Sequence, residues 1–256
     1  MRTLRLLALG WLFHFKMIMR SAFDGVGQVI YPLFFATVAF FVFRAGDSPR
    51  TLLYASLGAA VMGMWSATST TAGSAMQRER WQGTLEALVA TPAPFSLILL
   101  PVTIAMATIG IYSLVATLLW GRFLFGIQLH VVHPLLFAAA IPVTVLSFGA
   151  LGFLFAVCFV RFRAAWALGN MFEYPVWLVC GFLVPLSFFP SWVPPISWAL
   201  APTWGMNAIR QAALGGGPLD DLGMCLLLGA AYITLGIIVT DRVLDSARKR
   251  AALSLT

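Results

Sequence analysis

The sequence predicts an all-α polytopic membrane protein with six transmembrane helices, an N-terminal amphipathic interface helix and a re-entrant outer segment between spans five and six. Of its 256 residues, 61% are hydrophobic and only 10% are charged, whereas soluble domains carry about 25% charged residues. Runs without any charge cover residues 51–77, 87–121 and 174–209. Because a membrane span needs about 20 apolar residues, each of these runs can hold one.

Six spans are expected near residues 26–43, 52–76, 95–120, 134–160, 165–185 and 221–241. Each must be helical, because backbone polar groups in hydrocarbon have to be satisfied within the segment. With these six spans, both termini fall on the same side of the membrane, and 12 of the 16 basic residues lie on that side. The positive-inside rule therefore predicts that both termini are cytoplasmic and that the net charge of +7 reflects membrane anchors, not nucleic-acid binding. No linker or repeat divides the chain, which we treat as one domain, 1–256.

Residues 1–23 are expected to form a helix that lies in the cytoplasmic interface. At 100° per residue, its basic residues fall within about 60° of one another; they are Arg2, Arg5, Lys16 and Arg20. The opposite side carries Leu4, Leu7, Trp11, Phe15 and Ile18. This pattern predicts a basic face toward lipid phosphates and an aromatic face in the acyl boundary. The alternative is an ordinary flank of the first span.

The sequence carries no catalytic or metal-binding pattern of its own. A phosphate-binding loop needs a Gly-Lys pair, and neither lysine follows a glycine. The pair His130 and His133 stands in an expected outer loop without acidic or cysteine neighbours, and Cys158, Cys180 and Cys225 lie singly in apolar runs. We therefore predict no catalytic residue, no metal and no bound cofactor; if ATP drives the protein, a separate ATPase must bind it.

The loop between the second and third spans is predicted to form a cytoplasmic helix over residues 77–92. Trp81, Leu85 and Leu88 recur at helical spacing, and Pro92 and Pro94 end the pattern. A short cytoplasmic helix that joins two spans could bind a soluble partner and transmit its movement to both spans.

This loop resembles a known family. The pattern Arg-Glu-x-x-x-Gly-Thr-Leu-Glu-x-Leu-x-x-Thr-Pro over residues 78–92 is similar to the loop after the second span in type-2 ATP-binding-cassette transporter permeases. In that family the segment docks on the ATPase subunit. The resemblance implies an ATPase-coupling region made of Arg78, Glu79, Arg80, Gly83, Thr84, Glu86 and Pro92. Glu86 is the best candidate in it for a polar contact.

Residues 186–220 are expected to be broken helices that dip into the outer leaflet. They are rich in proline, too much so for a straight span, yet they stay apolar and contain Trp192, Trp198 and Trp204. The series Gly181 to Pro185, Phe189-Pro190, Pro194-Pro195, Ala201-Pro202-Thr203 and Asn207 to Arg210 also resembles the permease family, which implies a re-entrant hairpin that forms an outer gate. An amphipathic outer loop is the alternative.

Four residues are candidates for a translocation pathway: Glu173, Asn170, Thr68 and Thr71. An ionisable group in the middle of a span costs at least about 2.5 kcal/mol, so Glu173 should face protein or a wet cavity. Our hypothesis is that it lines the route and favours cationic amphiphiles; the alternative is a neutral, packed Glu. Thr68 and Thr71, with Gly58 and Gly63, form a small-residue surface for either a dimer seam or the pathway wall.

The resemblance implies the permease subunit of an exporter in the cytoplasmic membrane of a prokaryote. Its expected partners are two copies of an ABC ATPase, which bind ATP and Mg, a second permease subunit, more readily a homodimer than a heterodimer, and membrane lipids. Because the pathway spans are apolar, we expect a hydrophobic drug, an antibiotic (hence drug resistance) or a lipid-like substrate. The alternatives are a lipid-linked polysaccharide or glycolipid exporter, an ion-coupled secondary transporter that uses Glu173, and a non-transport anchor.

Overall fold

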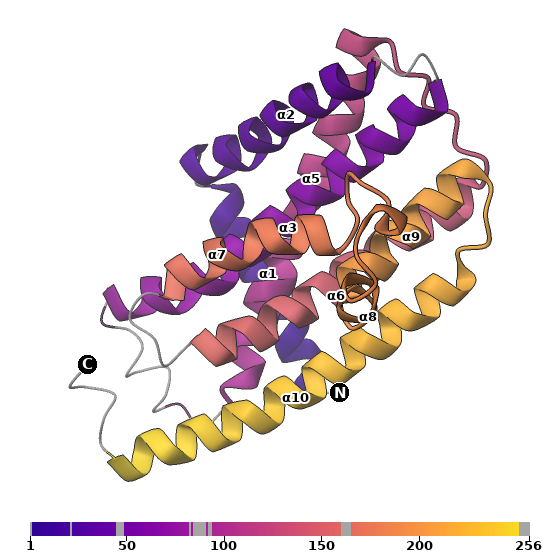
Figure 1. The fold of residues 1–256 in the computed structure, drawn as a ribbon. Coiled ribbons are helices and arrows are strands. Elements are labelled where there is room, and N and C mark those ends of the chain that lie inside the picture. The colour runs from indigo at the N-terminus through magenta and orange to yellow at the C-terminus, as the bar shows by residue number, and fades with distance from the viewer. Residues whose placement is uncertain are drawn as a thin grey trace.

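The computed structural model describes residues 2–20, 22–44, 49–81, 83, 91, 94–159 and 165–250. Every regular element in this part of the chain is a helix, which confirms the all-α prediction for these residues (Figure 1). In chain order the elements are α1 (Arg2–Met19), α2 (Ala22–Arg44), α3 (Pro49–Trp81), α5 (Ser96–Phe125), α6 (Pro134–Phe159), α7 (Ala165–Val179), η1 (Leu186–Phe188), α8 (Val193–Trp198), α9 (Ala201–Leu214) and α10 (Leu219–Arg250). Each of the six stretches expected to span the membrane overlaps a helix: in chain order α2, α3, α5, α6, α7 and α10.

Three of the described helices are long and apolar enough to cross a membrane: Ser96–Phe125, Pro134–Phe159 and Leu219–Arg242 within α10. The 30 residues of α5 rise about 45 Å at 1.5 Å per residue, more than the roughly 30 Å of a hydrocarbon core. The helix α7 has only 15 residues and ends at Val179, short of the expected end of the fifth span at residue 185.

The end of α7 is set by a glycine in the left-handed conformation. Gly181 has a φ of +68°, which a residue with a Cβ rarely adopts. Its amide donates to the carbonyl of Leu178 at 3.1 Å, and the amide of Phe182 donates to that of Trp177 at 3.2 Å. These two bonds close the helix in a Schellman motif. The chain then continues through η1, α8 and α9, so the proline-rich segment after α7 consists of short, broken helices as expected.

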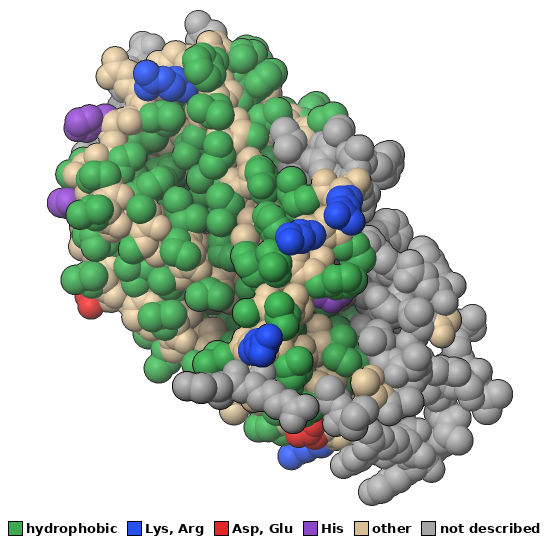
Figure 2. All heavy atoms as spheres, turned by 180° about the vertical axis from the view of Figure 1, so that it is seen from behind, with side chains coloured by type: hydrophobic (Ala, Val, Ile, Leu, Met, Phe, Trp, Pro, Cys, Tyr) green, Lys and Arg blue, Asp and Glu red, His purple; other side chains and the backbone are tan. Residues whose placement is uncertain are grey.

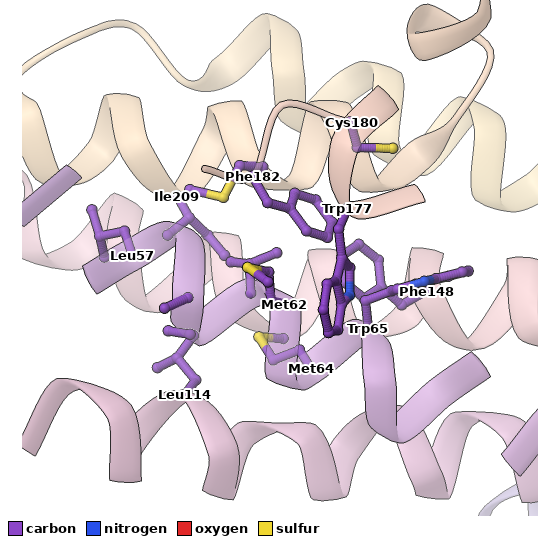
Figure 3. Packing of buried hydrophobic residues seen from close by; sticks show 14 of the residues in the cluster. Leu57, Met62, Met64, Trp65, Leu114, Phe148, Trp177, Cys180, Phe182 and Ile209 are labelled. Carbon is purple, nitrogen blue, oxygen red and sulfur yellow. The ribbon is translucent and has the colours of Figure 1, made fainter. Parts of the chain in front are cut away.

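The helix α3 lies at the centre of the molecule and packs against α2, α5, α6, α7 and α9. Trp65 of α3 is fully buried, and its ring meets that of Phe148 of α6 edge to face with centroids 5.7 Å apart (Figure 3). The long helix α10 runs along one edge of the bundle, beside α6 and α9 (Figure 1). Displacing α3 would therefore disturb most of the other helices.

Glycines let α3 approach its neighbours closely. A Cβ at Gly63 would overlap Ser113 Oγ of α5 and would lie 2.7 Å from Pro32 Cγ of α2. A Cβ at Gly110 of α5 would lie 2.8 Å from the Cα of Met64. The small-residue surface at Gly63 therefore packs against helices of the same chain, which corrects its assignment to a dimer seam or a pathway wall.

The N-terminal helix α1 packs on α5. The indole Nε1 of Trp11 donates to Thr108 Oγ1 at 3.1 Å, and Ile18 is buried in a cluster with Met106 and Ile109. Leu4, expected on the same apolar face, is 73% exposed. The part of this face formed by Trp11 and Ile18 therefore contacts protein and not the acyl boundary.

Candidate functional site

The first candidate site is a polar pair between α3 and α7. Glu173 of α7 is only 9% exposed, and Ser66 Oγ of α3 donates to its Oε1 at 2.5 Å. Because a carboxyl among apolar helices is costly unless it is hydrogen-bonded, this hydroxyl stabilises the acid where it lies. The carboxyl is thus turned toward α3, at the centre of the bundle.

The other pathway candidates separate in the structure. Asn170, half-buried, lies on α7 almost one turn before Glu173. Thr68 is completely buried; its hydroxyl donates to the carbonyl of Met64 at 3.0 Å, and its methyl group lies 2.7 Å from where a Cβ of Gly152 in α6 would be. Thr68 therefore packs α3 against α6, away from Glu173. The side chain of Thr71 lies outside the described residues.

An apolar groove lies between α3, α7 and the turn that follows α7. Its volume is about 240 Å³, and its wall is almost wholly apolar: Met62, Tyr174, Trp177, Leu178, Leu183 and Val184. The rings of Tyr174 and Trp177 meet edge to face with centroids 5.0 Å apart. Figure 3 shows Met62 and Trp177 of this wall within the packing around α3. Such a surface suits an apolar or aromatic molecule.

A buried arginine binds the turn after α7, which forms one side of this groove. Arg210 of α9 is 6% exposed; its guanidinium donates to the carbonyl of Gly181 at 2.7 Å and to that of Phe182. The same group lies over the ring of Tyr54 of α3, 3.5 Å from its centroid. The cation thus meets the carbonyls at the C-terminus of α7, where the helix dipole favours positive charge, and an aromatic face. Three elements, α3, α7 and α9, are joined at this point.

A glycine makes room for this arginine. A Cβ at Gly58 of α3 would overlap the carbonyl oxygen of Phe182 and would lie 2.9 Å from Arg210 Nη2. Gly58, like Gly63, therefore serves packing within the chain, which corrects its assignment to a seam or a pathway wall.

The predicted ATPase-coupling region begins on α3. Residues 77–81 are the last turn of this helix, so Arg78, Glu79 and Arg80 lie at its C-terminal end; their side chains lie outside the described residues. Gly83 is exposed with a φ of +69°, and a Cβ there would meet nothing within 4 Å. Thr84, Glu86 and Pro92 also lie outside the described residues.

Three of the four basic residues expected on the N-terminal helix are exposed, whereas its tryptophan forms a hydrogen bond with another helix. Arg5, Lys16 and Arg20 are exposed, while the side chain of Arg2 lies outside the described residues. Trp11 donates its only polar hydrogen to Thr108 of α5. Figure 2 shows scattered basic side chains crossing a largely hydrophobic surface.

Sequence reasoning missed the partners of Glu173 and Arg210. Ser66 and Glu173 are 107 positions apart, and no periodicity links them. Arg210 is the only charged residue between Glu173 and Asp220, a signal that could have marked it as a buried, paired cation. Its acceptors are backbone carbonyls, which leave no trace in side-chain patterns.

The class of protein follows from the surface and the helices. Large apolar side chains stand exposed on several helices, among them Phe34 (64%), Phe123 (77%) and Leu135 (85%), and Figure 2 shows a face covered by such side chains. Soluble proteins rarely expose apolar patches of this extent. Together with the three long apolar helices, this surface defines an integral membrane protein of the helical type.

The chain belongs to a family of membrane transporters. The model of the ABC-2 type transporter family matches residues 6–214, from α1 through α9, and the chain is therefore a member of that family. This confirms the family that residues 78–92 and the proline-rich segment after α7 resemble. A comparison with curated proteins finds no match.

Proposed function

We propose that this chain is the permease subunit of an ABC exporter and that a separate ATPase drives it. The family match over residues 6–214 carries the transport part of the proposal. The apolar groove supports a hydrophobic drug, an antibiotic or a lipid-like substrate rather than a sugar. In this proposal six helices span the cytoplasmic membrane of a prokaryote, both termini are cytoplasmic, and residues 186–220 dip into the outer leaflet as a gate.

The proposed assembly contains two copies of this chain and two ATPase subunits. ATP and Mg bind to the ATPases, and the permease supplies the path through the membrane. The contact with the ATPase is assigned to residues 78–92, because they begin in the last turn of α3 and carry the family-like motif.

The continuity of α3 gives this contact a mechanical route to the groove. One uninterrupted helix runs from Pro49 to Trp81, so Ser66 lies about 22 Å along its axis from Trp81. A displacement of the inner end moves Met62 and Ser66 with it, since a packed helix moves as a body. At the outer end, the contact of Arg210 with Tyr54 ties α3 to the outer segment. We infer that closure of the ATPases reshapes the groove wall and the outer gate together.

The test is purification of the tagged full chain from its native membrane, followed by measurement of ATP hydrolysis. We expect an ATPase subunit to copurify, and hydrophobic compounds to stimulate its hydrolysis. Glu86→Ala should abolish the stimulation. Gly83→Ala should reduce it, because its left-handed backbone costs a Cβ-bearing residue about 1–2 kcal/mol, whereas Gly83→Asn should retain it. Stimulation that survives in both Glu86→Ala and Gly83→Ala would refute the assignment of this segment.

An ion-coupled transporter remains the second candidate, because Glu173 is a buried acid in a helix of the bundle. The two mechanisms differ in their energy source. In inverted membrane vesicles, the exporter requires ATP and tolerates a protonophore, while the ion-coupled transporter works without ATP and fails with the protonophore.

A further inference from the structure

The Ser66–Glu173 pair lies next to the apolar groove, on the same two helices. On α3, Met62 of the groove and Ser66 are four residues apart; on α7, Glu173 and Trp177 of the groove are also four residues apart. Residues at this spacing lie on the same face of a helix, about one turn apart. The polar pair therefore lies at one end of the groove, about 6 Å along the helix axes from Met62 and Trp177, and Tyr174 of the groove wall directly follows Glu173.

The charges around the groove favour one sign of ligand. Its wall contains no charged side chain, and Glu173 lies at one end of it. The nearest cation described at its rim, Arg210, is already engaged by the carbonyls of Gly181 and Phe182 and by the ring of Tyr54. The Nε of Arg210 has no hydrogen-bond partner but is itself buried. An anion in the groove would therefore meet no accessible cation among the described residues, whereas a cation would lie about one helical turn from a carboxyl.

The aromatic wall favours a cation as well. Tyr174 and Trp177, whose rings meet edge to face with an interplanar angle of 80°, both line the groove. Aromatic faces attract cations within about 6 Å, and more strongly where water is excluded. The volume of about 240 Å³ is below the roughly 300 Å³ at which drug-sized pockets begin, which fits a compact molecule of one or two rings.

We propose that this groove is a binding site for lipophilic monovalent cations, with the apolar body against Met62, Tyr174 and Trp177 and the positive charge toward Glu173. The inference rests on the proposed function, of which it names the substrate class. Ser66 is a positioning residue, because its hydroxyl holds Oε1 of the carboxyl against α3. A neutral molecule of the same shape would fill the groove but would gain no electrostatic attraction to the carboxyl of Glu173.

The test uses two probes of nearly identical shape and different charge: tritiated N-methyl-4-phenylpyridinium, a cation, and 4-methylbiphenyl, its neutral analogue. The full chain is placed in nanodiscs of zwitterionic phospholipid, and binding of the cation is measured directly and in competition with the neutral compound. We expect saturable binding that unlabelled cation displaces at least tenfold more effectively than 4-methylbiphenyl. Glu173→Gln should weaken cation binding about tenfold, equivalent to about 1.4 kcal/mol.

A matched control removes the same charge elsewhere. Asp220 is exposed at the start of α10 and outside the groove, so Asp220→Asn should leave cation affinity within twofold. Leu178 lines the groove and is 60% exposed, so Leu178→Trp should fill the groove without overpacking the core and should weaken binding of both probes. If Glu173→Gln does not elute as a folded protein, Leu178→Trp serves as the test variant in its place.

Three results would overturn the proposal: no saturable cation binding, equal binding by the parent chain and a folded Glu173→Gln, or an undiminished affinity in Leu178→Trp. The experiment needs no ATPase. Binding without ATPase coupling would therefore refute the exporter and keep the site, while ATPase coupling without binding would refute the site and keep the exporter.

Discussion

Replacing Arg210 with methionine tests the contact that joins α3, α7 and α9. Methionine keeps the length of the side chain and a good helix propensity, but it leaves the carbonyls of Gly181 and Phe182 without their donor. Hydrogen bonds from a charged group contribute about 1.5–3 kcal/mol each, and the contact with Tyr54 adds about 1–2 kcal/mol. The desolvation of a buried guanidinium offsets part of this sum. We expect Arg210→Met to lower the free energy of unfolding by about 3 kcal/mol.

The assay is thermal unfolding of the detergent-solubilised full chain, followed by the loss of its monodisperse elution peak. For a chain of this size, 1 kcal/mol shifts Tm by about 2–4 °C, so Arg210→Met should melt roughly 6–12 °C below the parent. Arg122→Met is the matched control, because Arg122 is exposed in the last turn of α5 and should cost at most about 1 kcal/mol. Arg210→Lys should fall between them, since an ammonium lacks the planar fork that reaches both carbonyls. If Arg210→Met melts no lower than Arg122→Met, the buried contact does not stabilise the fold and the reasoning is wrong.

Two further substitutions probe the packing of α3 and α1. Gly58→Ala places a Cβ on a backbone carbonyl and should destabilise the chain by at least about 3 kcal/mol in the same assay. The control is Gly223→Ala, where a Cβ meets nothing within 4 Å; it should be neutral or stabilise the chain by up to about 1 kcal/mol. Equal melting temperatures of the two variants would contradict the close approach at Gly58. Trp11→Phe and Thr108→Val each remove one partner of the bond between α1 and α5, and each should cost about 1 kcal/mol. A double-mutant cycle should return a coupling energy of about 0.5–1 kcal/mol, and strict additivity would show that the bond contributes nothing.

The positions of the helices could be predicted because they depend on local composition. The apolar stretches near residues 95–120 and 134–160 became α5 and α6 within a few residues, since backbone groups in an apolar environment are satisfied only within a helix. The proline-rich stretch after Pro185 was broken as expected, because proline lacks the amide that a helix interior needs. The fifth span was predicted too long, since the turn at Gly181 depends on its left-handed backbone and not on hydropathy.

The pathway candidates could be predicted only as single residues. Glu173 stood out because a carboxyl in an apolar run is costly, but its neighbour Ser66 was one of several hydroxyls in α3. Thr68, two residues further on, turned out to face α6 instead. Side chains two residues apart on a helix point in directions that differ by about 200°. The sequence does not fix how α3 is rotated about its axis, so it does not show which of Ser66 and Thr68 faces Glu173.

The sequence by itself determined that this protein is helical and apolar, where its charges are concentrated, and which family it resembles. Each of these properties is written in consecutive residues, whose spacing and hydropathy act locally. Only the tertiary structure decided that Ser66 binds Glu173, that Arg210 closes the turn after α7, and that Trp11 binds Thr108 of α5. These contacts join residues from 28 to 107 positions apart, and they depend on how far one helix is rotated and shifted against another. Side-chain packing and the close approaches at Gly58 and Gly63 set that rotation, because hydropathy alone leaves it open.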